Sequence, residues 1–381
     1  MLIVLTSPHA VAPLGAPKLD VVAALIAATT KGHPVAIVSN HAEPKWFQGA
    51  FGGSNVQFLQ APGRQNGQVV TVNVEQFGVR PHDAVVLLGK AEDIMMAKNG
   101  GALMLAAGWV NDKQVKGLGV QVQDGKELLE VLDLTDKWSG AWWFSGNGGA
   151  GGYSVRALAD LSSMYWQPDA QQIFAGKLKT TVKNGGARLT ALLTVTARSL
   201  LTEGLGVSRE SLWGIYPSSS SKNNDSDVLS DFVHRLRTVT SRVRFAERGQ
   251  PLFIRHTPSA KRSSGAGGNR MDPSGQVETL HINPHYKKGR LVGRDVILLD
   301  DCTTYGVSFG VAAALLRKAG AASVTGVALG KFGNRLASYR IDINSDPFSH
   351  VKKASYMAHP PLPLLGVNNE AAKTMLQSLI P

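Results

Sequence analysis

Residues 294–308 constrain the fold of this chain more than any other stretch. The apolar run from Val296 to Leu299 is too short for a helix and is typical of a strand buried on both faces. Two acids, Asp300 and Asp301, follow this run, and a short loop of small and hydroxyl residues comes next. The apolar spacing from Phe309 to Ala319, followed by a glycine, predicts a helix. The order strand, loop, helix is typical of a parallel α/β domain.

The chemistry of this loop favours a phosphorylated sugar as its ligand. Backbone N–H groups and hydroxyls at the start of a helix can form a binding site for a phosphate. Two acids beside them can hold the vicinal hydroxyls of a sugar, directly or through Mg²⁺. The alternative is a strand–loop–helix unit without a ligand, but adjacent carboxylates at a buried strand end are costly without a use. We therefore expect a binding site here.

The residue order resembles the phosphoribosyl-pyrophosphate (PRPP) signature of the type I phosphoribosyltransferases, in which apolar residues precede two acids and a Thr/Gly/Ser loop. The resemblance implies that Asp300 and Asp301 face the ribose hydroxyls and hold Mg²⁺, directly or indirectly. It also implies that the loop wraps the 5-phosphate. The phosphate ligands are then Thr303, Thr304, Tyr305, Gly306, Val307 and Ser308. Tyr305 departs from the family, which usually has a second small hydroxyl residue there.

Composition narrows the class of protein. A chain of 381 residues is long enough for two domains, and no apolar run is long enough to span a bilayer. The first five residues read as a strand rather than a signal peptide, and the single cysteine, Cys302, suits a reducing compartment. We therefore expect a cytoplasmic protein with no membrane partner.

The charge is strongly basic and unevenly distributed. The net charge is +12, whereas the first 150 residues hold 11 Lys and Arg against 12 Asp and Glu. The basic surplus therefore belongs to the remainder of the chain. Such a field attracts PRPP, which is a polyanion, but it would attract nucleic acid as well. Charge alone does not choose between these partners.

The N-terminal part alternates strands and helices, which indicates a parallel α/β domain. The expected strands are residues 1–5, 34–40 and 83–89, and the expected helices are residues 19–28 and 92–101. This pattern resembles the haloacid-dehalogenase (HAD) hydrolases.

Two motifs carry the resemblance to the HAD family, and the catalytic positions depart from it. Ser39-Asn40 matches the second motif, and residues 88–94 resemble the fourth. Thr6 and Pro8 stand where the family has its nucleophilic and acid/base aspartates, and Lys90 replaces the first metal-binding acid. No aspartyl-phosphate can form without the carboxylate nucleophile, and a lysine would repel Mg²⁺.

Residues 1–137 are therefore expected to form a HAD-like scaffold without hydrolase activity. Asp93 and Ser39 are either remnants of the site or helix caps, and we favour caps. Residual phosphatase activity in this half is a third, less favoured reading of the function.

Residues 138–152 mark a change in composition, and we expect them to be a Gly/Trp-rich linker. Three tryptophans and a phenylalanine argue that this linker packs, on the interdomain surface in our interpretation. A stacking platform for single-stranded nucleic acid is the alternative.

Residues 153–340 are expected to form the phosphoribosyltransferase-like domain. The pattern predicts helices at Ser154–Met164 and Leu189–Leu201, and then a strand at Ser211–Tyr216. In the resembled family the loop after this strand binds the pyrophosphate of PRPP. We expect the corresponding loop of this chain to bind pyrophosphate, and its residues are Ser218, Ser219, Ser220, Ser221 and Lys222. The alternative is a solvated turn.

A further strand at Leu252–Arg255 precedes residues 256–276, which have few apolar residues and several cations. In type I enzymes a mobile loop in this interval closes over the active site and excludes water. The expected partners of the leaving pyrophosphate are Lys261, Arg262 and Arg270. Over residues 210–332 the spacing also resembles the competence-associated, ComF-like branch of the family.

The last strand of the pattern, Ser323–Leu329, is followed by a loop in which Lys331 and Phe332 are expected to border the acceptor base. Residues 341–381 read as a proline-containing tail that ends in a helix. We expect this tail to run over the surface, as part of a hood over the site or of a homodimer contact.

One potential metal site is rejected. His281 and His285 are four residues apart with Pro284 between them, so no helix pairs their side chains.

These observations predict an α/β protein of two domains, HAD-like and type I phosphoribosyltransferase-like. The expected function is an Mg²⁺-dependent phosphoribosyltransferase that transfers the 5-phosphoribosyl group of PRPP to a nitrogen nucleophile, a nucleobase or related heterocycle, and releases pyrophosphate. The alternative is a non-catalytic module that senses PRPP or nucleotides or accompanies nucleic acid. The sequence does not name the acceptor.

Overall fold

The structure is a computed structural model that describes residues 1–164, 167–186, 188–208, 211–224, 228–240, 249–259 and 269–380. The chain divides into two compact units. The first comprises Met1–Gly140, Thr190–Arg209 and His234–Ala246, and the second comprises Ala141–Leu189, Glu210–Val233 and Glu247–Pro381. The first boundary between the units therefore falls inside the segment 138–152.

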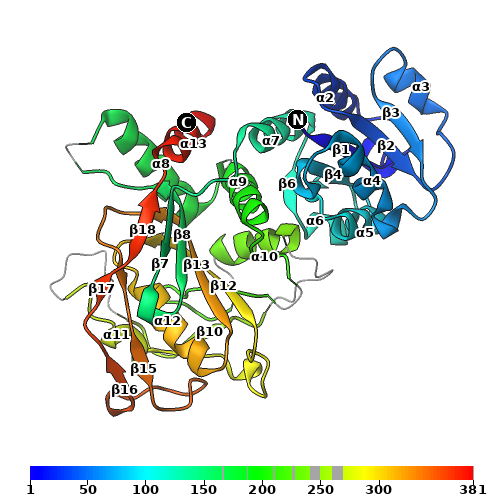
Figure 1. Cartoon of the computed structure of the whole chain (residues 1–381). Coiled ribbons are helices and arrows are strands. Elements are labelled where there is room, and N and C mark those ends of the chain that lie inside the picture. The colour runs from blue at the N-terminus through cyan, green and yellow to red at the C-terminus, as the bar shows by residue number, and fades with distance from the viewer. Residues whose placement is uncertain are drawn as a thin grey trace. The chain divides into compact units, whose positions relative to one another are not determined.

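The first unit contains a six-stranded parallel sheet with the strand order β3-β2-β1-β4-β5-β6 (Figure 1). Its strands are β1 (Ile3–Thr6), β2 (Val35–Ser39), β3 (Gln57–Gln60), β4 (Ala84–Leu88), β5 (Leu103–Ala107) and β6 (Val120–Val122). Every residue of β1, β2, β4 and β5 is buried. Continuous apolar strands of this kind are expected where helices cover both faces of a parallel sheet.

The helices of this unit follow the strands in turn. They are α1 (Pro8–Val11), α2 (Leu19–Thr30), α3 (Trp46–Phe51), α4 (Gln68–Phe77), α5 (Ala91–Gly100), α6 (Lys113–Lys116) and α7 (Gly125–Lys137). Later in the chain come α9 (Arg188–Glu203) and α10 (Val228–Thr240), which confirms the helix predicted at Leu189–Leu201. Trp138 is buried, and its Nε1 donates to Ser199 Oγ of α9 at 2.9 Å.

The second unit is built on a mixed six-stranded sheet with the strand order β18-β7-β8-β13-β12-β9. Strands β8, β13, β12 and β9 are parallel, and β7 is antiparallel to both of its neighbours. These strands are β7 (Phe144–Asn147), β8 (Ser154–Asp160), β9 (Leu212–Ile215), β12 (Asp295–Thr303), β13 (Ser323–Lys331) and β18 (Leu365–Asn368).

Smaller elements surround this sheet. A two-stranded antiparallel ribbon consists of β10 (Phe253–Arg255) and β11 (Leu280–Ile282), and two further short pairs are β14 (Ala337–Ser338) with β17 (Leu362–Pro363) and β15 (Ile341–Ile343) with β16 (Tyr356–Ala358). The helices are α8 (Asp169–Asn184), α11 (Ser274–Val277), α12 (Val307–Lys318) and α13 (Glu370–Leu379). The strands predicted at 211–216, 252–255, 296–299 and 323–329 and the helix at 309–319 are confirmed.

The helix predicted at Ser154–Met164 is wrong, because residues 154–160 form strand β8. This strand pairs with the long strand β13 from Ser154 to Asp160. Its Arg-Ala-Leu-Ala sequence has good helix propensity, but pairing inside a buried sheet overrides such a local preference.

The segment expected as a linker and the tail expected on the surface meet in the same sheet. β7 lies within residues 138–152, and β18, from the tail, pairs with it. Gly146 lies opposite Gly366 in this pair. A Cβ at Gly366 would stand 2.4 Å from Phe144 Cζ, so the ring packs where a side chain is missing. Glycines that signal flexibility in the sequence therefore serve close packing here.

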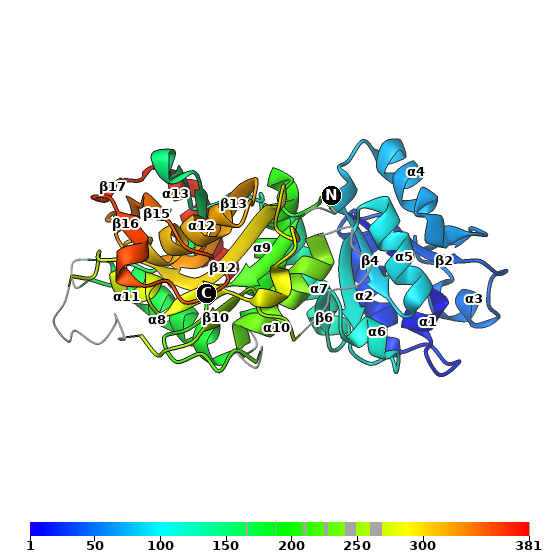
Figure 2. The same ribbon diagram turned by 90° about the horizontal axis from the view of Figure 1, so that it is seen from below.

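Helix α12 packs against β12 and β13 (Figure 2). Phe309 is fully buried, and a Cβ at Gly326 of β13 would lie 2.5 Å from Phe309 Cδ1. The missing side chain at Gly326 lets the helix approach the sheet closely. This contact holds the first turn of α12 against the sheet, where Gly326 pairs with Leu298 of β12.

None of the helices in the described part of the chain combines the length and the apolar composition that a membrane span requires.

Candidate functional site

Asp300 and Asp301 lie at the carboxyl end of β12, inside the strand rather than after it. The neighbouring strand β9 pairs only as far as Leu299, so the two acids extend beyond it. Asp300 is buried with 8% of its surface exposed, and its Oδ1 accepts from Asp301 N at 2.9 Å. Asp301 Oδ1 accepts from Cys302 N at 2.6 Å. The structure therefore brings both predicted acids to one edge of the sheet.

The two carboxyl groups repel each other in a buried place. Burial, followed by the charge of Asp301, raises the pKa of Asp300 well above its usual range. The Ser308 hydroxyl of α12 hydrogen-bonds with the Asp300 carboxyl and partly opposes this shift. A cation or hydroxyl donors placed at this pair would relieve the repulsion.

Cys302 follows the acids and shares their surroundings. Burial raises the pKa of its thiol, and the charges of Asp301 and Asp300 add to the effect. Lys183 and Lys179 of α8 oppose it, so two cations of that helix lie within electrostatic reach of this edge of the sheet. A thiol with a raised pKa is a poor nucleophile, which agrees with a packing role for Cys302.

The loop between β12 and α12 is short and turns at Gly306. This glycine has φ +78°, and it precedes the first residue of α12, Val307. A Cβ at Gly306 would stand 3.0 Å from the carbonyl oxygen of Ala337, so both conformation and space favour glycine. Because the first N–H groups of a helix have no partner within the helix, the loop presents donors beside the acids.

Arg270, one of the predicted cations, lies beside this loop. Its guanidinium carbon is 5.4 Å from the centre of the Tyr305 ring. Tyr305, the residue that departs from the family pattern, thus contacts a cation from the interval expected to cover the site. Lys261 and Arg262 lie outside the described residues.

The serine-rich loop begins next to the acids. Tyr216 N donates to the carbonyl of Leu299 at 2.8 Å, so the loop leaves β9 beside the residue that precedes Asp300. Within the loop, Ser221 N donates to Ser218 O at 3.2 Å. The structure therefore brings the segment 218–222 to the same edge of the sheet as the acids.

Arg255 of β10 holds this loop from beneath, a role that sequence reasoning missed. Its Nε donates to Ser218 O at 2.7 Å and its Nη2 to Pro217 O at 3.1 Å. The same guanidinium donates to Thr279 Oγ1 and to Gln276 Oε1, both at 2.9 Å. The only sign of this role in the sequence was an arginine at the end of a predicted strand, which does not indicate the loop that it contacts.

The charge of Arg255 is buried, with 4% of the residue exposed. Within the described part of the chain no carboxylate forms an ion pair with it, and its partners are neutral oxygens. The loop above it ends at Asn223, whose φ of +57° lies in the left-handed region that asparagine adopts more readily than most residues other than glycine. A buried cation beneath a hydroxyl-rich loop favours an anion as the ligand.

Lys331 belongs to strand β13 and not to the loop that was expected after it. It pairs with Thr303 of β12, is 1% exposed, and lies with Nζ 4.7 Å from the ring centres of both Trp143 and Phe144. Burial lowers the pKa of Lys331 to about 8, against the charge of Asp160. Phe332, the other residue expected at the acceptor, is half-buried, and its N–H donates to Thr303 O.

Asp160 is a further buried charge at this edge that the sequence did not reveal. It ends β8, and its Oδ2 is 2.7 Å from Nζ of Lys373 in α13. The carboxyl ends of β8, β13 and β12 therefore carry alternating charges, from Asp160 through Lys331 to the paired acids.

The corresponding edge of the first unit is filled by its own side chains. Asp93, fully buried, accepts from Ser7 Oγ at 2.6 Å and from Gly89 N at 2.7 Å, and it forms an ion pair with Arg64. It also accepts from Lys90 N at the start of α5 at 3.1 Å, which confirms the expectation of a helix cap. Ser39 accepts from His41 N and caps a turn rather than a helix.

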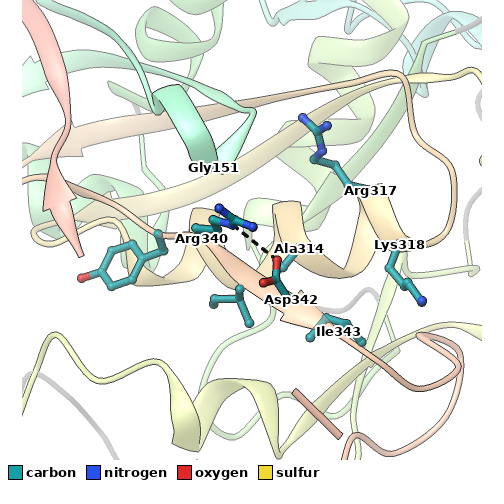
Figure 3. Close-up of a pocket in the computed structure, with 9 residues that line it drawn as sticks. Gly151, Ala314, Arg317, Lys318, Arg340, Asp342 and Ile343 are labelled. Atoms are coloured by element: carbon teal, nitrogen blue, oxygen red, sulfur yellow. Dashed lines mark ion pairs between the residues drawn. The ribbon is translucent and has the colours of Figure 1, made fainter. Parts of the chain in front are cut away.

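A surface hollow of about 320 Å³ lies at the other end of α12. Figure 3 shows Arg317 and Lys318 on one side of it and the ion pair of Arg340 with Asp342 on the other, at 3.5 Å. None of the paired acids or loop residues lines this hollow, so its volume carries no information about their chemistry.

Comparison of the chain with protein-family models, with curated proteins and with solved structures found no match. The residues and their geometry are therefore the basis for any functional conclusion.

Proposed function

We propose that the second unit binds PRPP with Mg²⁺ and transfers the phosphoribosyl group to a nitrogen nucleophile, with release of pyrophosphate. The observation that carries the proposal is the convergence at one sheet edge of Asp300 and Asp301, the turn at Gly306 and the loop held by Arg255. PRPP carries two ribose hydroxyls, a 5-phosphate and a pyrophosphate. Each of these groups has a chemically suitable counterpart among the residues at this edge.

The donor set fits Mg²⁺. Asp300 and Asp301 supply hard carboxylate oxygens, and a cation would relieve the repulsion that raises the pKa of Asp300. When bound, Mg²⁺ supplies positive charge to the pyrophosphate oxygens.

The groups of the chain bind and orient the substrate. The N–H groups at the start of α12 would hold the 5-phosphate, and the Ser308 hydroxyl beside them would keep the Asp300 carboxyl oriented. The serine hydroxyls of 218–221, Lys222 and the charge of Arg255 would hold the pyrophosphate, and Arg270 would add charge from the side of Tyr305. Such positioning contributes more to phosphoribosyl transfer than a strong general base.

The reaction breaks the bond between C1 of the ribose and the pyrophosphate oxygen, and it forms a bond between C1 and the acceptor nitrogen. The bonding electrons leave with the pyrophosphate, and the acceptor nitrogen loses one proton to the pyrophosphate or to solvent. Positive charge develops on the ribose ring in the transition state. The paired carboxylates would stabilise that charge electrostatically.

The test is a calorimetric titration with PRPP and Mg²⁺ of the wild type and of Asp300→Asn and Asp301→Asn variants. The matched control is Asp295→Asn, at the other end of β12, where the carboxylate accepts from Ser323 Oγ. We expect both site variants to bind PRPP at least about tenfold more weakly, because each removes a charged ligand, and the control to bind normally. Site variants that bind like the wild type would refute the proposal.

The same protein and variants distinguish the transferase from a second candidate function, a non-catalytic PRPP sensor. If PRPP binds but no nitrogen heterocycle releases pyrophosphate, the unit is a sensor. The contact of Tyr305 with Arg270 favours the sensor, because Arg270 is the cation proposed to neutralise the leaving pyrophosphate and the contact occupies it. Salt-sensitive binding to single-stranded DNA or RNA, without any PRPP binding, would instead assign the basic surplus to nucleic acid.

A further inference from the structure

Three histidines converge on one face of the β10–β11 ribbon. The nitrogen atoms of His256, His281 and His350 that could bind a metal all lie within 4.8 Å of one another. The rings of His256 and His350 are stacked with centroids 3.6 Å apart, and the ring of His281 is 5.3 Å from the first and 5.2 Å from the second. The sequence separates these residues widely, and His285, the neighbour weighed earlier, is not among them.

The ribbon and one loop explain this convergence. His281 pairs with Ile254, and His256 N donates to Thr279 O, so His281 and His256 project from the same face. Arg255 projects from the opposite face, toward the serine-rich loop. His350 follows a turn that docks on β11, because Ile282 N donates to Pro347 O at 2.9 Å.

Two of the ring nitrogens lack a partner. His256 Nε2 and His281 Nδ1 are buried and form no hydrogen bond within the described part of the chain. Such orphaned polar atoms are costly and call for an explanation, such as an ion. His256 Nδ1 is 3.0 Å from Thr257 Oγ1, a contact that leaves Nε2 as the nitrogen available to an ion.

We propose that His256, His281 and His350 bind a divalent transition-metal ion, with Zn²⁺ as the expected occupant. Imidazole nitrogens suit Zn²⁺ and its first-row neighbours, whereas Mg²⁺ requires oxygen ligands. Three histidines leave a fourth coordination position for water or a small ligand.

The cluster needs a small adjustment to close on an ion. Nitrogens bound to one tetrahedral Zn²⁺ at ~2.0 Å are ~3.3 Å apart, whereas the histidine nitrogens of the empty cluster lie within 4.8 Å of one another. His350 is the exposed member, so rotation of its side chain can unstack it from His256 and bring its nitrogen inward. The ion would then tie the ribbon to the 346–350 turn.

The test is titration of chelator-treated protein with Zn²⁺ in a buffer free of competing ligands. We expect one equivalent to bind, and His281→Gln and His350→Gln to weaken binding by about tenfold or more. Because His350 is exposed, its variant keeps the fold even if the His281 variant is destabilised. Co²⁺ in place of Zn²⁺ should give a visible absorption band in the wild type that both variants lose.

The matched control is His285→Gln, which removes a neighbouring histidine outside the cluster. It should bind Zn²⁺ like the wild type, as should the Asp300→Asn/Asp301→Asn double variant, because the metal site does not depend on the proposed PRPP site. Absence of stoichiometric binding, an equal loss in His285→Gln, or full competition by Mg²⁺ would overturn the proposal.

Discussion

Replacement of Lys331 by methionine should stabilise the protein at neutral pH. The ammonium group is buried, and its pKa falls from 10.5 to about 8, chiefly through burial. That fall corresponds to about 3 kcal/mol by which folding disfavours the charged amine at pH 7. Against this gain, methionine loses the hydrogen bond that the amine donates to Gly333 O and leaves that carbonyl without this donor, which costs about 2 kcal/mol. Methionine fills a similar volume without a charge, so Lys331→Met should gain about 1 kcal/mol.

The sign of the effect should reverse with pH. Because the folded-state pKa lies below the unfolded one, the unfolded chain binds more protons between pH 8 and 10.5, and the wild type gains stability as pH rises. The variant lacks this gain. Its advantage should therefore shrink by about 2 kcal/mol between pH 7 and pH 9.5.

The assay is urea unfolding of both proteins, followed by tryptophan fluorescence at the two pH values. The control is Lys353→Met, at an exposed lysine, which should show no pH-dependent difference from the wild type. A Lys331→Met variant that is less stable than the wild type at pH 7, or a difference that is the same at both pH values, would refute the reasoning.

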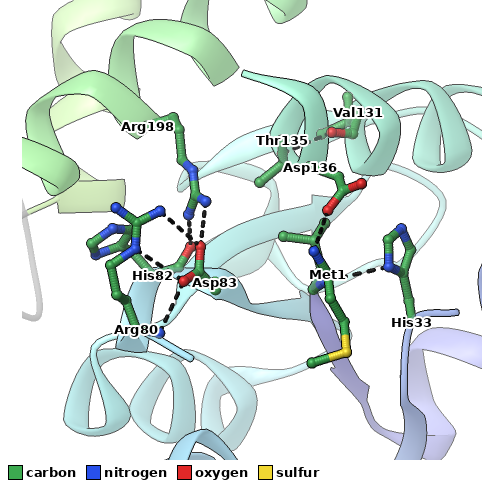
Figure 4. A network of polar contacts seen from close by, with 10 residues as sticks. Met1, His33, Arg80, His82, Asp83, Val131, Thr135, Asp136 and Arg198 are labelled. Atoms are coloured by element: carbon green, nitrogen blue, oxygen red, sulfur yellow. Dashed lines mark hydrogen bonds and ion pairs between the residues drawn. The ribbon is translucent and has the colours of Figure 1, made fainter. Parts of the chain in front are cut away.

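Three further predictions concern packing and charge. Gly326→Ala should lower the free energy of unfolding by about 1–3 kcal/mol, because its Cβ would lie 2.5 Å from the Phe309 ring; a variant as stable as the wild type in urea would contradict this packing. Arg80 and Arg198 hydrogen-bond Asp83 (Figure 4) and lower its pKa to about 2, so the wild type should lose about 1 kcal/mol of stability as pH falls from 6 to 3. Arg198→Met should flatten that loss in the same unfolding assay, and an unchanged pH slope would count against the contact. Arg255→Met should weaken PRPP binding by about tenfold or more in calorimetry, by releasing the 217–218 backbone; unaltered affinity would remove it from the site.

Local patterns in the sequence predicted β9, β12 and β13, three of the six strands of the second sheet. The apolar run before Asp300 and the small residues after it predicted β12, its turn and α12, because each depends on residues within one short stretch. The same holds for the alternating strands and helices of the first unit and for the capping role of Asp93. A strand buried on both faces and a helix N-cap each carry their own signal.

Contacts between distant segments were decided only by the tertiary structure. Residues 154–160 have helix propensity but pair with β13, and a glycine-rich stretch and a proline-containing tail meet as β7 and β18. Arg255 reaches the serine-rich loop, and the cluster of His256, His281 and His350 forms, because the β10–β11 ribbon presents opposite faces. Sequence spacing reports neighbours along one element, whereas strand pairing and side-chain burial are set by what packs across the sheet.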